Sequence, residues 1–137
     1  MKLKLQLVRD GDVVWEIPLS PTDWPKERLE NELEALEDNF QGFSSIFAAL
    51  SNDTRLKMMK RLMEEDDCTI NFTDFMRDLH LNPKIVWENA KKLSEGGLLE
   101  KVDRGLYRCS DFGQRRFILV SFALRHLMEA LEGMEDY

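Results

Sequence analysis

The chain has 137 residues and a formal net charge of −7, and 33% of its positions are charged. This length is typical of a single domain, and a chain of this size can bury a core without disulfides. Its two cysteines, Cys68 and Cys109, are far apart in the sequence and match no C-x-x-C pattern, which argues against a disulfide framework and a cysteine zinc site. No signal-peptide pattern or membrane-length apolar run is present, so we expect a soluble cytoplasmic protein without membrane attachment.

Residues 1–19 have the pattern of a β-hairpin. Apolar and polar residues alternate on both sides of Asp10-Gly11, a dipeptide typical of tight hairpin turns. The alternating apolar residues are Leu3, Leu5 and Leu7 before the turn and Val13, Trp15, Ile17 and Leu19 after it. An isolated hairpin is barely stable in water, so we expect this face to be buried on the core or in a partner subunit.

Residues 26–50 are predicted to form a long first helix. Their apolar residues recur at alternating intervals of four and three positions, while glutamates occupy many of the other positions. The recurring residues are Leu29, Leu33, Leu36, Phe40, Phe43, Phe47 and Leu50. This pattern fits an amphipathic core helix, and it also fits a helix that pairs with another chain.

The pattern of residues 51–109 predicts a helix-turn-helix followed by a hairpin. A helix beginning near Asn52 directs Leu56, Met59, Leu62 and Met63 inward, and a shorter one carries Phe72, Phe75, Met76 and Leu79. Asn82 and Pro83 are typical of a helix start, so a further helix spans about 82–95 and directs Val86, Ala90 and Leu93 inward. The hairpin of residues 98–109 turns at Asp103-Arg104-Gly105.

A last helix is predicted over residues 111–133, and it is strongly apolar. Phe117, Val120, Leu124, Leu127 and Leu131 recur at intervals of three and four, which is the spacing of a helix-pairing seam. A helix that is apolar on nearly all sides exceeds what one small core can cover. We therefore expect a homodimer interface formed by Leu29, Leu33, Leu36, Phe40, Phe117, Val120, Leu124, Leu127 and Leu131. The alternative is that the first and last helices pack only on each other within one chain.

Two stretches carry a resemblance to a known family. The segment from Phe47 to Leu56, FAALSNDTRL, leads into a helix, and KLSEGGLL from Lys92 to Leu99 leads from a helix into the hairpin. Both resemble the ArsR-type winged helix-turn-helix regulators, over roughly residues 43–117. The resemblance implies a dimeric fold, mainly α with small β-hairpins. We expect it to form a single domain over residues 1–137, with the N-terminal hairpin and most of the first helix outside the usual pattern.

The resemblance also implies binding of double-stranded DNA through a recognition helix at about 82–95 and a wing at 98–109. Residues 84–117 carry eight basic and five acidic side chains, against five basic and ten acidic over residues 1–50, which favours the middle of the chain as a polyanion surface. A helix fits the major groove, where lysines neutralise phosphates and Asn can read an adenine edge. The candidate DNA-binding residues are Lys84, Trp87, Asn89, Lys91, Lys92, Arg104 and Arg108. Trp87 fits a structural role beside the wing equally well.

Other functions find less support in the sequence. His126 and Glu129 supply too few ligands for a transition-metal site, so we expect no metal and no cofactor. Nucleotide-binding and nucleophile motifs are missing, so we expect no catalytic residues and no enzyme activity. The alternative to a DNA-binding regulator is a winged helix that binds another protein within an intracellular assembly, as the acidic total and the glutamate-rich first helix would allow. The sequence indicates no particular effector.

Overall fold

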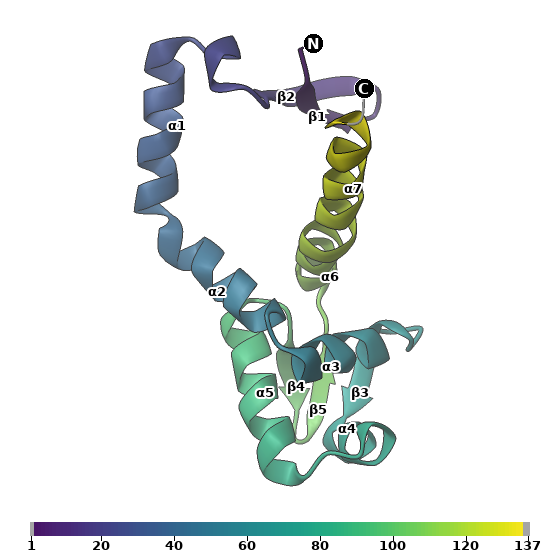
Figure 1. The fold of residues 1–137 in the computed structure, drawn as a ribbon. Coiled ribbons are helices and arrows are strands. Elements are labelled where there is room, and N and C mark those ends of the chain that lie inside the picture. The colour runs from purple at the N-terminus through teal and green to yellow at the C-terminus, as the bar shows by residue number, and fades with distance from the viewer. Residues whose placement is uncertain (1, 136–137) are drawn as a thin grey trace. The chain divides into compact units, whose positions relative to one another are not determined.

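The computed structural model describes residues 2–135, which its internal contacts divide into two compact units (Figure 1). One unit comprises the described residues up to Gln41, and the other begins at Gly42. Both are built from helices and small antiparallel sheets, which confirms the predicted fold class, mainly α with small β-hairpins.

The first unit begins with the predicted hairpin. Strand β1 (Lys4–Arg9) pairs with β2 (Asp12–Pro18), and the turn contains Asp10 and Gly11, both at positive φ. On one face, Glu16 accepts hydrogen bonds from Lys4 Nζ at 3.2 Å and from Gln6 Nε2 at 2.6 Å. These cross-strand contacts fix the register on the polar side of the hairpin.

The register of the hairpin changes near the turn. Leu7 lies opposite Trp15, but Val8 lies opposite Val13, so the second strand carries one extra residue. A bulge of this kind disrupts the alternation of side chains along a strand. The apolar face therefore includes Leu7 and Trp15. Val13, which lies opposite Val8, is not on this face, although its spacing predicted that it would be.

The predicted long helix over residues 26–50 is two helices in the structure. After a 3₁₀ turn (Pro21–Asp23), α1 spans Lys26–Asp38 and α2 spans Phe40–Leu50. Asn39 separates them, and its side-chain Nδ2 donates to the Ala35 carbonyl at 2.7 Å. Asparagine side chains compete for backbone groups in this way, which explains why an uninterrupted apolar repeat did not produce an uninterrupted helix.

The second unit contains the helices α3 (Asp53–Met63), α4 (Phe72–Leu79) and α5 (Pro83–Glu95), grouped around a small sheet (Figure 1). The sheet is antiparallel with the strand order β3–β5–β4, formed by β3 (Thr69–Asn71), β4 (Glu100–Asp103) and β5 (Leu106–Arg108). The hairpin of β4 and β5 was predicted. Strand β3 was not, because three residues are too few for alternation to be recognised.

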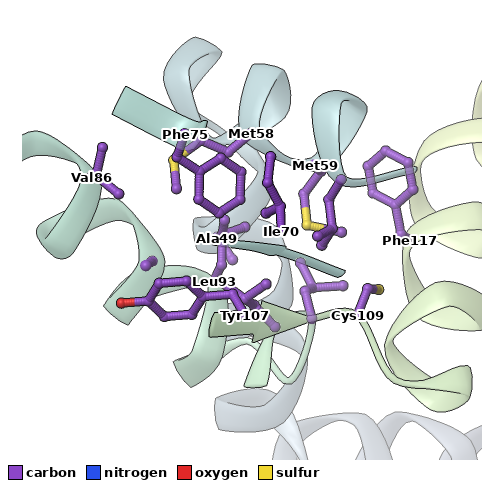
Figure 2. Close-up of a cluster of buried hydrophobic side chains, with 14 residues drawn as sticks. Ala49, Met58, Met59, Ile70, Phe75, Val86, Leu93, Tyr107, Cys109 and Phe117 are labelled. Carbon is purple, nitrogen blue, oxygen red and sulfur yellow. The ribbon is translucent and has the colours of Figure 1, made fainter. Parts of the chain in front are cut away.

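A hydrophobic core holds these elements together (Figure 2). Met58, Met59 and Leu62 of α3 are fully buried, and the Phe75 ring of α4 lies 6.2 Å from the Tyr107 ring of β5. Val86, Ala90 and Leu93 are the buried residues of α5, as predicted. Met59 and Leu62 are buried as predicted, but Leu56, which was also predicted to point inward, is 44% exposed, and Met58 is buried in its place.

The C-terminal helical region runs through α6 (Asp111–Phe117), a π-helical segment (Ile118–Ala123) and α7 (Leu124–Glu135). Ser110 caps it, because its Oγ accepts the Gly113 N–H at 3.1 Å. Within the π-helical segment the Leu124 N–H donates to the Leu119 carbonyl, five residues earlier. This wider turn interrupts the regular helix predicted over residues 111–133. Phe117, which was predicted at the dimer interface, lies before this segment and is buried in the core of its own chain, with 4% of its surface exposed.

Candidate nucleic-acid interface

The turn between α4 and α5 is set by three consecutive local signals. His80 closes α4 in the left-handed region, with φ of 53°. Asn82 then caps α5, because its Oδ1 accepts the Ile85 N–H at 2.9 Å, and Pro83 is the first residue of the helix. Proline suits this position because its missing N–H would have no partner there. The cap predicted at Asn82 is therefore confirmed.

Burial of one side of α5 leaves the opposite side free for a ligand. The exposed side chains include Lys84, Trp87, Lys91 and Lys92. Trp87 is 57% exposed, and Lys91 Nζ lies 5.5 Å above its ring. At this distance the ammonium group is attracted to the face of the indole ring by a cation–π interaction.

Glutamates on the same helix reduce the positive charge of this surface. Lys84 Nζ lies 3.9 Å from Glu88, and Lys92 Nζ lies 3.6 Å from Glu95. Both pairs are exposed, so each holds its lysine only weakly. Within residues 2–135, Lys91 has no carboxylate at ion-pair distance, which makes it the helix's most available lysine.

Asn89 already has hydrogen-bond partners inside the chain. Its Oδ1 accepts from Arg55 Nη1 at 3.0 Å, and its Nδ2 donates to the Ile85 carbonyl at 2.8 Å. The Arg55 guanidinium also donates to the carbonyls of Ala49 at 2.7 Å and Ala48 at 2.9 Å. A side chain held in this way orients the helix and is not available to a base edge without breaking these bonds.

Arg55 links three helices, a role that its position in the sequence did not reveal. It lies on α3, yet its guanidinium contacts the end of α2 and the middle of α5. The carbonyls at a helix C-terminus carry partial negative charge, which favours a cation there. Arg55 belongs to the FAALSNDTRL segment that carries the family resemblance, but the spacing of residues along the sequence does not reveal its partners on α2 and α5.

The wing presents Arg104 at its tip. Gly105 follows at φ of 69°, and Asp103 Oδ1 accepts the Arg104 backbone N–H at 2.7 Å, so the turn is fixed by local bonds. Arg108 lies lower on β5, where its Nη2 is 2.6 Å from Glu100. Of the two candidate arginines, Arg104 is therefore exposed without an ion pair among the described residues, and Arg108 is already neutralised.

Helices α4 and α5 form a helix-turn-helix, and β4 and β5 follow it as a two-stranded wing. The second unit is a winged helix-turn-helix. No protein-family model matches the chain, and neither does any curated protein. A crystal structure of Sco5413, a MarR family transcriptional regulator from Streptomyces coelicolor, superposes with a TM-score of 0.48 and 16% sequence identity, covering 82% of this chain and 83% of that one. The winged-helix assignment rests on the element order and sheet of this chain.

An apolar surface lies away from the α5 face, on α2 and the C-terminal helices. Phe43 and Phe47 of α2 and Leu119, Phe122 and Leu124 of the C-terminal region are exposed, Leu119 at 64%. Two hollows in this surface share the side chains of Phe47, Val120 and Leu124. We call the surface formed by these six residues the α2–α7 apolar surface: Phe43, Phe47, Leu119, Val120, Phe122 and Leu124. Leu127 lines one hollow, and Leu131 lies further along α7, partly exposed.

Three of the four predicted interface residues in the first unit are also exposed. They are Leu33, Leu36 and Phe40, while the fourth, Leu29, is partly buried.

No helix in residues 2–135 is long and apolar enough to cross a membrane. In the same part of the chain, no three His, Cys, Asp or Glu side chains form a group that could hold a metal ion.

Proposed function

We propose that the protein is a DNA-binding transcriptional regulator that recognises duplex DNA as a homodimer, through α5 and the wing. The observation that supports this best is the exposed α5 face, with Lys91 over Trp87, combined with the exposed Arg104 at the wing tip. In a winged helix, the recognition helix enters the major groove and the wing contacts the adjoining backbone. Lys84 and Lys92 add phosphate contacts once their weak glutamate pairs open.

Within this proposal the candidate residues have different roles. Lys91 and Arg104 contact phosphate directly, and Trp87 packs against the sugar-phosphate backbone. Asn89 orients α5 through Arg55 and contacts no base. Arg108 braces the wing through Glu100.

The homodimer forms in this proposal through the α2–α7 apolar surface. Large contiguous exposed apolar patches are uncommon on monomeric proteins. The surface carries both protruding side chains, such as Leu119 and Phe122, and the two hollows between Phe47 and Leu124. A two-fold interface needs such self-complementarity, because the same patch meets itself. Two recognition helices about 34 Å apart could then enter successive major grooves.

The test is selection of bound sequences from a random duplex pool, followed by affinity measurements as salt is varied. Recovery of an inverted repeat supports both DNA binding and two-fold symmetry. The double variant Lys91→Glu/Arg104→Glu should bind every duplex much more weakly, since phosphate contacts release counterions. Arg9→Glu, a charge reversal on the N-terminal hairpin, is the matched control and should retain affinity. Equal affinity in all three proteins would show that the proposed face is wrong.

A second candidate function is supported by the ion pairs on α5. Lys84 and Lys92 each lie beside a glutamate, which lowers the positive potential that duplex DNA would meet. The alternative is a winged helix that binds another protein without contacting DNA. Absence of duplex binding at low salt, together with saturable binding of a purified protein partner, would favour this alternative.

A further inference from the structure

The two cysteines, 41 positions apart in the sequence, are neighbours in the sheet. Strand β3 pairs with β5 so that Thr69 lies opposite Arg108, and continuing this register by one residue places Cys68 opposite Cys109. The Cys109 backbone N–H donates to the Cys68 carbonyl at 2.9 Å. Directly opposed, hydrogen-bonded residues of antiparallel strands have Cα atoms about 5.5 Å apart. Disulfides occur at Cα separations of about 4.4–6.8 Å.

Both cysteine side chains also lie on the core side of the sheet. Cys109 belongs to the buried core cluster, and the Sγ of Cys68 lies 4.0 Å from the Sδ of Met63, which packs against the same cluster. Ile70 and Tyr107 are opposite each other and buried. Cys109 is 1% exposed, and Cys68 is partly buried against the same cluster. The two thiols therefore point to one region of the protein.

The backbone around Cys68 leaves room for adjustment. Cys68 has φ of 50° and its own N–H donates to the Glu65 carbonyl, so one of the two hydrogen bonds of a regular strand pair is missing. Cβ atoms in hydrogen-bonded pairs are about 5.5 Å apart, whereas a disulfide brings them to about 3.8 Å. The cysteine pair must therefore close slightly to form a bond. Strained disulfides are more easily reduced, which suits a reversible bond.

We propose that Cys68 and Cys109 form a reversible intramolecular disulfide and so make this end of the sheet a redox-modification site. With a peroxide as oxidant, the sulfur of the more accessible Cys68 attacks one peroxide oxygen, the O–O bond breaks, and the alcohol or water leaves. The resulting sulfenic acid is attacked by the Cys109 sulfur, which forms the S–S bond and releases water. The two thiols lose two protons and two electrons in total, and the peroxide is reduced.

The bond would join two segments within the winged helix-turn-helix unit. Cys68 lies in the turn between α3 and β3, and Cys109 immediately precedes Ser110, the cap of α6. Oxidation would thus hold β3 against the base of the wing and the start of α6. This inference does not depend on DNA binding, so its failure and that of the proposed function can be distinguished.

We expect the reaction to be slow at neutral pH. Burial raises the pKa of the Cys68 thiol, and burial together with the nearby Cys68 and Glu100 raises the pKa of Cys109 to about 11. The thiolate is the reactive form, so oxidation should be run at mildly alkaline pH.

The experiment treats the reduced full chain, at low protein concentration, with hydrogen peroxide and then with an alkylating agent. We expect a product of one-chain mass that has lost two alkylatable thiols and the mass of two hydrogen atoms, and that dithiothreitol restores. Cys68→Ser should abolish the product. Cys109→Ala should also abolish the product, and circular dichroism must show that this variant is folded. If the Cys109→Ala variant is unfolded, Cys68→Ser alone serves as the test.

The unfolded wild-type chain, oxidised in denaturant, is the control for the chemistry. The inference is overturned if the unfolded chain forms the bond while the folded chain keeps both thiols. It is equally overturned if the folded chain yields only disulfides between chains, or only over-oxidised Cys68 with Cys109 still free. A rise in the denaturation midpoint of the oxidised chain, reversed by reduction, would support the bond's place in the folded structure.

Discussion

Arg55 Nη1 donates to Asn89 Oδ1 at 3.0 Å, and this bond connects α3 to the middle of α5. The same guanidinium donates to the carbonyls of Ala48 and Ala49, where α2 ends. One side chain thereby links three helices, and α2 carries part of the apolar surface proposed for dimerisation. If the proposed function is right, the Arg55–Asn89 bond provides a physical route from the α2–α7 apolar surface to the proposed DNA-binding face.

The first prediction concerns this link. Arg55→Ala removes three hydrogen bonds from a charged, partly buried donor, and the free energy of unfolding should fall by roughly 1.5–3 kcal/mol. Asn89→Ala should cost about 1 kcal/mol, and the double variant should show a coupling of at least about 0.5 kcal/mol in urea unfolding. Lys57→Ala, on the exposed side of the same helix, is the control and should cost less than about 0.5 kcal/mol.

The same variants distinguish an orienting Asn89 from one that reads a base. If Asn89 orients α5, Asn89→Ala should weaken binding to all duplex sequences to a similar degree. If it reads an adenine edge, the variant should relax preference at one position of the selected sequence. The second result would contradict the role that its bonds to Arg55 and Ile85 indicate.

The second prediction compares the two wing arginines. Arg104 is exposed at the tip, whereas Arg108 is paired with Glu100. Arg104→Ala should reduce the slope of log affinity against log salt by about 1, the effect expected when one phosphate contact is lost. Arg108→Ala should change the slope by much less, because a neutralised arginine releases few counterions. A larger slope change for Arg108 than for Arg104 would reverse the assignment.

Elements with strong local signals could be predicted from the sequence. The Asp10-Gly11 turn, the Asn82–Pro83 helix start and the buried face of α5 each depend on a few neighbouring residues, and each is found in the structure. The interruption at Asn39 was missed because the apolar repeat continues across it. The π-helical turn in the last helix could not be predicted, because spacing rules assume a uniform helix. Of the predicted seam, Val120, Leu124 and Leu127 line one hollow, whereas Phe117 is buried in its own chain.

In the candidate site, too, features set by neighbouring residues could be predicted, whereas contacts between distant segments could not. The exposed positions of Lys84, Trp87 and Lys91 follow from helical periodicity, so the sequence could indicate them. The roles of Arg55 and of the Cys68–Cys109 pair depend on contacts between segments 34 and 41 residues apart. No sequence pattern encodes such contacts directly. The two cysteines in particular are far apart in the sequence, and nothing in their spacing indicates that β3 and β5 bring them together.

The third prediction tests the homodimer. Leu119→Glu and Leu124→Glu place a charge in the α2–α7 apolar surface, and each should convert a dimer into a monomer by light scattering at micromolar concentration, since a buried unpaired charge is costly. Both residues are exposed in the single chain, so each variant should still fold. Val102→Glu, a similar change on an exposed valine of β4, is the control. A wild-type mass of one chain would contradict the dimer.

The fourth prediction concerns the N-terminal hairpin. Every buried core residue of the described chain lies between Ala49 and Phe117. Deleting residues 1–19 should therefore leave a cooperative unfolding transition for the winged helix-turn-helix, followed by circular dichroism. The deletion removes the apolar face of Leu5, Leu7, Trp15 and Ile17, so dimer affinity should fall if that face meets a partner subunit. A truncated chain with unchanged dimer affinity would show that the hairpin is dispensable for assembly.

The fifth prediction concerns pH. Burial, with the nearby Cys68 and Glu100, raises the pKa of the Cys109 thiol from its ordinary value of 9.0 to about 11. Between these values the unfolded chain binds fewer protons than the folded chain, so the free energy of unfolding should fall as the pH rises.

Cys109→Ala removes this thiol and should therefore lessen the decline, by an amount of order 2 kcal/mol over the interval. Urea unfolding of the reduced proteins from about pH 8 to about pH 11 measures the effect, because lysines and tyrosines titrate in both proteins and largely cancel. Cys68→Ser provides a comparison at the more exposed cysteine and should lessen the decline to a smaller extent. Parallel curves for the wild type and Cys109→Ala would mean that the buried thiol keeps an ordinary pKa in the folded chain.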